Sequence, residues 1–326
     1  CEVASASFHS KIIQNMENPT FGVEAFDMED LPKIKVSFEK NGFAVVKNVF
    51  SASEVEEMRE EMMRIIEAME PEEHPRCVFT TYDEEKHVAD KYFLESCDKI
   101  RFFYEEGAFN EGKHMTVPKA SALNKVGHAL HWQNDVFRKY TFSDRIKVKA
   151  FRLIIPKKIV NVHRFEQPEV VQSMYIFKQP KIGGAVSAHI DATFISVDPI
   201  DHLLGMWIAI DDADISNGCL WFVPGSHKVD TVNYRFKRTH ATEGSLLKFE
   251  GERPAYNEDA FIGVPVEKGS VVLIHGCVAH KSEANTSTKR RHSYAFHIVD
   301  RENSSYSDDN WLQPTEMYSF PKLFAN

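Results

Sequence analysis

The chain has 326 residues, of which 43% are hydrophobic and 12% are aromatic, and its formal net charge is −9. That apolar content can fill the core of one large domain or of two modest ones. The negative charge argues against a broad phosphate-binding surface, and no apolar run is long enough to span a membrane, so neither nucleic acid nor a membrane is an expected partner.

The N-terminal segment changes from irregular to periodic. Residues 1–26 lack a clear hydrophobic period and contain Pro19 and Gly22, which predicts a flexible tail. Residues 27–40 predict a short helix that ends at Gly42, and residues 43–47 predict a strand.

A longer helix is expected after Ser51, ending before Pro71. Two capping boxes could begin it, one pairing Ser51 with Glu54 and the other pairing Ser53 with Glu56. Methionines recur along it at helical spacing. A core face explains such a row better than a cofactor contact does, because methionine fills irregular cores readily. We expect this helix to pack on a sheet.

The next part of the chain alternates between charged and apolar segments. Residues 71–91 are densely charged and predict a flexible segment, residues 100–104 predict a strand, and residues 124–140 predict a helix. Within that helix, the spacing of His128 and His131 would allow a pair of metal ligands. No acidic partner fits them, so packing or capping is the favoured role of both.

From residue 170 onward, short β-type segments alternate with turn-forming residues. Strands are predicted at 170–177, 185–197, 205–210, 220–223, 263–266, 271–274 and 292–299. This pattern predicts a mainly β protein with flanking helices, built on a double-stranded β-helix (a cupin-like jelly roll). We expect a single domain over residues 27–326, with a buttress of helices and strands up to 169, the jelly-roll core at 170–300 and a C-terminal extension at 301–326.

His189 and Asp191 give the strongest chemical signal. If both lie on one strand, residues two apart point to the same face. An imidazole and a carboxylate on one face supply two of the three ligands that hold non-haem Fe(II). A surface ion pair is the commoner origin of a lone His-x-Asp, but His280 and Arg291 follow downstream in β-type segments. Taken singly, each histidine could instead be a hydrogen-bonded core residue.

Together these motifs resemble the Fe(II)/2-oxoglutarate oxygenases of the phytanoyl-CoA dioxygenase family. The resemblance rests on the His-x-Asp pair, the loop Gly-Cys-Leu-Trp-Phe-Val-Pro-Gly-Ser-His at 218–227, a distal histidine followed two residues later by Ser282, and Arg291. It runs from about residue 36 to residue 324.

The resemblance implies an Fe(II) ion held by His189, Asp191 and His280, with 2-oxoglutarate as cosubstrate. It leaves open whether ascorbate is also needed, and the residues alone leave Mn or Zn open. The remaining histidines of the region, His227, His275 and His297, are expected to be structural.

The resemblance also implies which residues contact 2-oxoglutarate. Arg291 should pair with its distal carboxylate, because a guanidinium binds a carboxylate through two hydrogen bonds and stays charged when buried. Ser282 should donate to the same carboxylate, Met174 and Trp207 should form pocket walls, and Lys125 should contact the cosubstrate. Without the resemblance, these four residues are an ordinary strand serine, two apolar strand residues and a solvated lysine at the start of a helix.

The expected reaction converts 2-oxoglutarate and O2 to succinate and CO2 while a second substrate is hydroxylated. The presence of Asp191 favours oxygen transfer, because related halogenases have a small residue in its place. The second substrate, a small molecule or a peptide, stays unidentified. A phytanoyl-CoA-like acyl-CoA hydroxylase stays the less favoured alternative, because the chain has no evident peroxisomal signal and no Lys/Arg cluster outside 289–291 could bind the nucleotide phosphates.

Two functions of other kinds stay open. One is a non-catalytic jelly-roll sensor that binds metal or 2-oxoglutarate, and the other is a cupin-like isomerase that uses a different metal. The oligomeric state is open as well.

The cysteines bear on location. The chain has five, scattered and without a Cys-x-x-Cys pair, as is typical of a reducing compartment. No signal-peptide core follows the N-terminus and the C-terminus is not a peroxisomal signal. We therefore expect a cytoplasmic protein, with the nucleus as the alternative, and not a secreted one.

Overall fold

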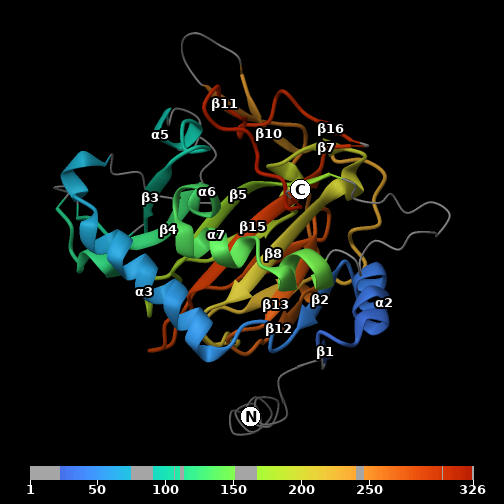
Figure 1. Ribbon diagram of the computed structural model, residues 1–326, viewed down its shortest axis with the longest axis horizontal. Helices are drawn as coiled ribbons and strands as arrows, with labels where there is room; N and C mark the ends of the chain where they lie inside the picture. The colour runs from blue at the N-terminus through green and yellow to red at the C-terminus, as the bar shows by residue number, and fades with distance from the viewer. Residues whose placement is uncertain are drawn as a thin grey trace, which may run out of the picture.

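The computed structural model describes residues 23–74, 91–105, 107–110, 114–150, 167–239, 246–302 and 304–324. Two β-sheets form the body of the protein, and helices cover the larger one (Figure 1). The protein is therefore mainly β with flanking helices, and the two sheets form the predicted jelly roll. In the parts of the chain that the structure describes, no helix combines the length and hydropathy of a membrane span.

The larger sheet has eight strands, in the spatial order β1 (Ala25–Phe26), β2 (Phe43–Val46), β13 (Val271–His275), β8 (Leu203–Ala209), β15 (Ser293–Asp300), β5 (Pro168–Ile176), β4 (Leu123–His128) and β3 (Ile100–Tyr104). The smaller sheet has four strands, in the order β12 (Ile262–Val264), β9 (Leu220–Phe222), β14 (His280–Ser282) and β6 (Val186–His189). Two further strand pairs join β10 (Arg235–Arg238) to β11 (Leu247–Glu250) and β7 (Val197–Asp198) to β16 (Ser305–Tyr306). The α-helices described are α2 (Leu31–Asn41), α3 (Ala52–Ala68), α5 (Lys91–Leu94), α6 (Leu130–Gln133) and α7 (Asp135–Thr141).

Strand β8 shows how one sheet serves two apolar layers. Successive side chains of a strand point to opposite faces. Leu204, Met206 and Ile208 pack in the core under α3 and α7, whereas Trp207 and Ala209 pack with residues of the smaller sheet. A pocket lined by Trp207, Leu220 and Ile274 lies on this second face.

Helix α3 begins as the sequence predicts. The hydroxyl of Ser51 accepts a hydrogen bond from the backbone N–H of Glu54, whose carboxylate accepts one from the backbone N–H of Ser51. The first of the two candidate capping boxes is therefore the one that forms. Met58 and Met62 are buried against the sheet, which confirms that the methionine row is a core face. The helix before it also ends as predicted, with Gly42 in the left-handed conformation at φ 82°.

Three predictions about the elements are wrong. The predicted helix at 124–140 begins as strand β4, and helix starts only at Leu130. The predicted strand at 185–197 stops at His189. The last two residues of the predicted tail form β1, parallel to β2. In the first case β4 pairs with strands on both sides, so tertiary hydrogen bonds override the helical spacing of its apolar residues.

Two other predictions fall largely outside the described residues. These are the rest of the tail, residues 1–22, and most of the charged segment at 71–91, of which 75–90 are not described.

Candidate metal centre

His189, Asp191 and His280 come together between the two sheets. Strands β6 and β14 are neighbours, and His189 lies directly opposite His280, with ring centroids 4.3 Å apart. Oδ1 of Asp191 lies 3.7 Å from Nε2 of His189 and 3.6 Å from Nε2 of His280. One ligand atom from each residue lies within 4.8 Å of the other two. The structure therefore brings the three predicted ligands to one point.

Both imidazoles present the same nitrogen to this point. Nδ1 of His189 lies 2.8 Å from the carbonyl oxygen of Ser187, and Nδ1 of His280 lies 3.0 Å from that of Val278. A carbonyl oxygen only accepts, so Nδ1 is the donor in each ring, and Nε2 is the nitrogen that faces Asp191. Burial, with His189 adding to it, lowers the pKa of His280 to about 4, so this ring is neutral at neutral pH. Two imidazole nitrogens and a carboxylate are a donor set that fits Fe(II).

Asp191 faces the two histidines from a turn and not, as the sequence suggested, from the strand of His189. It does not share a strand with His189 but begins the 3-10 turn Asp191–Thr193. The turn is held by a hydrogen bond from the N–H of Ala192 to the carbonyl of Gly276, at 2.8 Å. Burial opposes ionisation of Asp191, but the nearby imidazoles outweigh it and hold the pKa of this carboxyl well below its usual range.

His297 is a functional candidate that the sequence analysis missed. Its Nε2 lies 3.2 Å from Oδ2 of Asp191, the carboxylate oxygen that does not face the ligand histidines. Its Nδ1 lies 3.0 Å from the side-chain nitrogen of Gln172. That amide nitrogen only donates, so Nδ1 accepts and Nε2–H donates to Asp191. The available signal was the two-residue alternation of β15, which puts His297 on the same face as Ala295, a residue that also lines the pocket.

Arg291 supplies a buried positive charge to the same pocket. Its guanidinium donates to the carbonyl of Gly218 at 2.9 Å, to Ser282 Oγ at 3.0 Å and to Ser293 Oγ at 3.1 Å, and it lies 5.4 Å from the ring centre of Trp207. Burial lowers the pKa of Arg291 to about 10, so it stays charged at neutral pH. Among the described residues, no carboxylate lies within ion-pair distance of it. A bound anion would therefore supply the missing counter-charge.

All of the predicted site residues line this one pocket: Lys125, Met174, His189, Asp191, Trp207, His280, Ser282 and Arg291. Lys125 is buried on β4 and does not begin a helix, and burial lowers its pKa to about 7. Its Nζ lies 4.0 Å from the sulfur of Met174. The hydroxyl of Ser282 donates to Gly218 at 3.0 Å, so its contact with a cosubstrate carboxylate stays a prediction.

The two other histidines weighed in the sequence analysis are not metal ligands in the described structure. His131 is buried between the hydroxyls of Ser173 and Tyr318, each at 2.8 Å. His128 lies 2.7 Å from the hydroxyl of Ser96. Both rings are buried and contact neighbouring hydroxyls, which agrees with the expected packing role.

Comparison with solved structures shows the fold. The non-heme alpha ketoglutarate dependent epimerase SnoN from nogalamycin biosynthesis aligns with a TM-score of 0.59 over 91% of this chain and 99% of that one, at 16% identity. EctD from S. alaskensis, solved with 2-oxoglutarate and 5-hydroxyectoine, aligns with a TM-score of 0.52 over 83% and 76% of the two chains, at 14% identity.

Comparison of sequences shows the family. Phytanoyl-CoA dioxygenase domain-containing protein 1 homolog of Caenorhabditis elegans is 54% identical over 295 residues, which is 90% of this chain and 99% of that protein. The domain-containing protein 1 of Danio rerio is 43% identical over 291 residues, covering 88% and 96%. The family model for phytanoyl-CoA dioxygenase (PhyH) matches residues 38–293. Residues on which the resemblance rests also line the pocket. The chain therefore belongs to the phytanoyl-CoA dioxygenase family.

Proposed function

We propose that this oxygenase is an Fe(II)- and 2-oxoglutarate-dependent dioxygenase. In the reaction, 2-oxoglutarate, O2 and a substrate R–H become succinate, CO2 and R–OH. The observation that carries the proposal is the placement of the His-Asp-His set and the unpaired cation of Arg291 in one pocket. The solved complex of SnoN with Fe3+, alpha ketoglutarate and nogalamycin RO, which shares the fold, supports the choice of metal and cosubstrate.

Each residue of the pocket has a defined task in this proposal. His189, Asp191 and His280 would hold the Fe(II) ion through two imidazole nitrogens and one carboxylate oxygen. Bound Fe(II) supplies the redox chemistry between 2-oxoglutarate and O2. Arg291 binds the distal carboxylate of 2-oxoglutarate, and the ring of Trp207 beside it keeps water away from the guanidinium.

The pocket favours an enzyme over a sensor. It continues past the metal ligands along apolar side chains that include Phe194, Phe236 and Phe249. A sensor needs space for metal and 2-oxoglutarate alone, whereas a hydroxylase needs room for a second molecule beside them.

The surroundings of Lys281 support a second substrate other than an acyl-CoA. This lysine lines the pocket, but its ammonium pairs with Glu258 at 2.6 Å and with Glu283 at 2.7 Å. Its charge is therefore already matched by carboxylates and is not available for nucleotide phosphates.

Succinate release tests the proposal. Protein reconstituted with Fe(II) and supplied with 2-oxoglutarate and air should form succinate, measured by proton NMR. His189→Ala should abolish turnover, and Arg291→Ala should raise the KM for 2-oxoglutarate by at least about thirtyfold, because it removes one partner of a buried charge pair. Arg290→Ala is the matched control, since Arg290 is half exposed beside Asp211 and should leave turnover unchanged.

Unchanged turnover in the His189 and Arg291 variants would refute the proposal. Binding of metal and 2-oxoglutarate with no succinate at all would identify a sensor.

A further inference from the structure

The part of the pocket beyond the metal ligands has an aromatic wall. Phe93 stacks on Trp311 with centroids 4.5 Å apart, and Phe236 lies 6.1 Å from Phe93. Phe194 lies 5.8 Å from Phe236 and, edge to face, 5.8 Å from the ring of His189. These rings form a continuous row that reaches the metal centre, and all of them line the pocket. Such a wall suits a flat ring that can stack against it.

One polar ring is set into this wall. His128 is fully buried, lines the same pocket and has Phe93, Phe103 and Trp311 around it at centroid distances of 5.5, 5.4 and 5.0 Å. Its Nδ1 lies 2.7 Å from the hydroxyl of Ser96. Its Nε2 is buried and has no hydrogen-bond partner among the described residues.

Ser96 determines which nitrogen of His128 carries the proton. The hydroxyl of Ser96 donates its single hydrogen to the carbonyl of Phe93, at 2.6 Å, so it accepts from Nδ1–H of His128. Nε2 is therefore a hydrogen-bond acceptor. Burial, with Lys125 and His297 adding to it, holds the pKa of His128 well below its usual range, which keeps that lone pair free of a proton.

A second buried acceptor points the same way. Gln172 lines the pocket, and its buried Oε1 has no hydrogen-bond partner among the described residues, while the nitrogen of the same amide is bonded to His297. An acceptor buried without a partner costs free energy, which a ligand that donates a hydrogen bond recovers. The pocket therefore selects for donors on an apolar molecule.

We propose that the second substrate is a flat, uncharged molecule whose ring stacks on the aromatic wall and whose N–H or O–H group donates a hydrogen bond to Nε2 of His128. This inference rests on the proposed function, because a hydroxylase requires a second substrate in this space. It assigns His128 to substrate binding, in addition to its packing role.

An isosteric pair of probes, indole and benzothiophene, tests this proposal. They have similar size and shape, but only indole has an N–H. Their binding to the full chain, in the presence of Zn²⁺ and 2-oxoglutarate, is measured by saturation-transfer NMR with competition. Indole should bind at least about tenfold more tightly, because benzothiophene leaves the acceptor unpaired.

Variants separate the hydrogen bond from general packing. His128→Leu should reduce the indole-to-benzothiophene affinity ratio to near one. Ser96→Ala should lower the ratio as well, because Nδ1 loses its acceptor and the ring proton can move to Nε2. His131→Gln, which changes a buried histidine that does not line the pocket, should leave the ratio as in the wild type.

Equal affinities in the wild type, or a ratio that survives both His128→Leu and Ser96→Ala, would overturn the proposal. If thermal melts show that His128→Leu does not fold, Ser96→Ala decides alone. The test involves no turnover, so it is separate from the proposed function. Succinate formation without the indole preference refutes only the substrate class, and the preference without succinate refutes only the reaction.

Discussion

The contact between His297 and Asp191 determines which carboxylate oxygen faces the two candidate ligand histidines. A carboxylate has two oxygens and could turn either of them toward the ligand histidines. The N–H of His297 engages Oδ2 and leaves Oδ1 facing His189 and His280. A residue that donates a hydrogen bond to a metal ligand orients that ligand and tunes its basicity.

Removing the N–H donor of His297 should therefore weaken metal binding while the protein still folds. His297→Phe should lower the affinity for Co²⁺ or Mn²⁺ by about ten- to a hundredfold, the range typical of such partners. Titration of the Co²⁺ absorption bands measures this without any turnover. His297→Gln keeps an N–H donor and should recover most of the affinity.

His275→Phe is the control for that experiment. The ring of His275 packs against that of His227 with centroids 4.9 Å apart, and in the described part of the chain no hydrogen bond or ion pair joins it to Asp191. An affinity in His297→Phe equal to that of the wild type would show that the carboxylate needs no such support.

Sequence motifs identify some of the individual site residues, and three-dimensional contacts identify the others. The placement of the three candidate metal ligands and Arg291 in one pocket could be predicted, because these residues occur in recognisable segments of the chain. His297 and His128 could not, because each acts through a partner far away in sequence, Asp191 in one case and Ser96 in the other. Only the three-dimensional structure shows which ring nitrogen of such a histidine makes a hydrogen bond within the protein and which one is left for a ligand.

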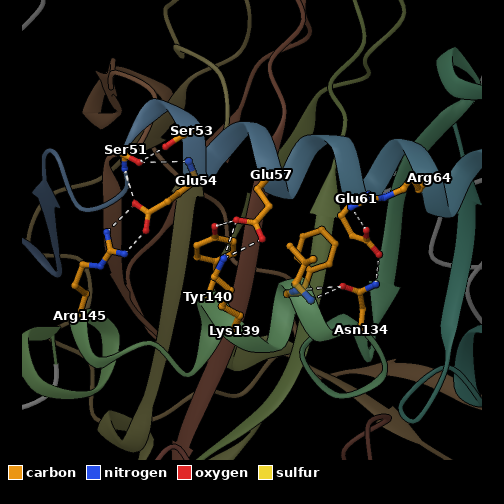
Figure 2. A network of polar contacts seen from close by, with 12 residues as sticks. Ser51, Ser53, Glu54, Glu57, Glu61, Arg64, Asn134, Lys139, Tyr140 and Arg145 are labelled. Carbon is orange, nitrogen blue, oxygen red and sulfur yellow. Dashed lines mark hydrogen bonds and ion pairs between the residues drawn. The ribbon is translucent and has the colours of Figure 1, made fainter.

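Helix α3 is fixed to the fold by one row of carboxylates. Glu54, Glu57 and Glu61 recur at helical spacing and so share one face. Figure 2 shows this face pointing toward the segment around α7, where its partners are Arg145, Lys139 with Tyr140, and Asn134. On another face of the same helix, Met58 and Met62 are buried in the core and hold the helix on the sheet.

Glu54 makes the stability of this row depend on pH. The hydrogen bond from Arg145 is the largest cause that lowers the pKa of Glu54, to about 2, while burial opposes it and Ser51 assists. Because the folded pKa lies below the unfolded one, the stabilisation is present above about pH 4.5 and is lost as the pH falls toward 2. Glu54→Gln should cost about 1 kcal/mol at pH 7, through the capping box and a partly exposed ion pair, and almost nothing near pH 2.

Thermal or urea unfolding of both proteins across this pH range measures that difference. Glu60→Gln is the matched control, since Glu60 is exposed on the same helix and should show no such trend. A constant difference between wild type and Glu54→Gln from pH 7 to pH 2 would contradict the assignment.

Secondary-structure predictions succeeded where residues close in sequence determine the structure, and failed where pairing between distant strands determines it. The capping box of α3 and the glycine after α2 are local, and both formed as expected. Strand β14 was expected around His280 and Ser282, but its bounds were not predicted, because its three residues gain their structure from β6 and β9 on either side. Strand β4 was predicted as a helix for the same reason.

In the whole molecule, the site joins the two sheets. His189 and His280 belong to the smaller sheet, whereas Trp207 on β8 and Lys125 on β4 belong to the larger one. Arg291 lies just before β15 of the larger sheet and bonds to Ser282 of the smaller one. Ligands in this pocket should therefore stabilise the packing of one sheet on the other.

Stepwise stabilisation by ligands should follow from this arrangement. A ligand at a hundred times its Kd raises the unfolding free energy by about 2.7 kcal/mol. Zn²⁺ should raise the Tm of the wild type, and 2-oxoglutarate should raise it again, because it adds the missing counter-charge at Arg291. Arg291→Met should keep the first step and lose the second, whereas His189→Ala should lose both. Differential scanning calorimetry resolves the two steps. A 2-oxoglutarate step that persists in Arg291→Met would mean that the cosubstrate carboxylate binds elsewhere, and Lys125 would then be the cation to substitute next.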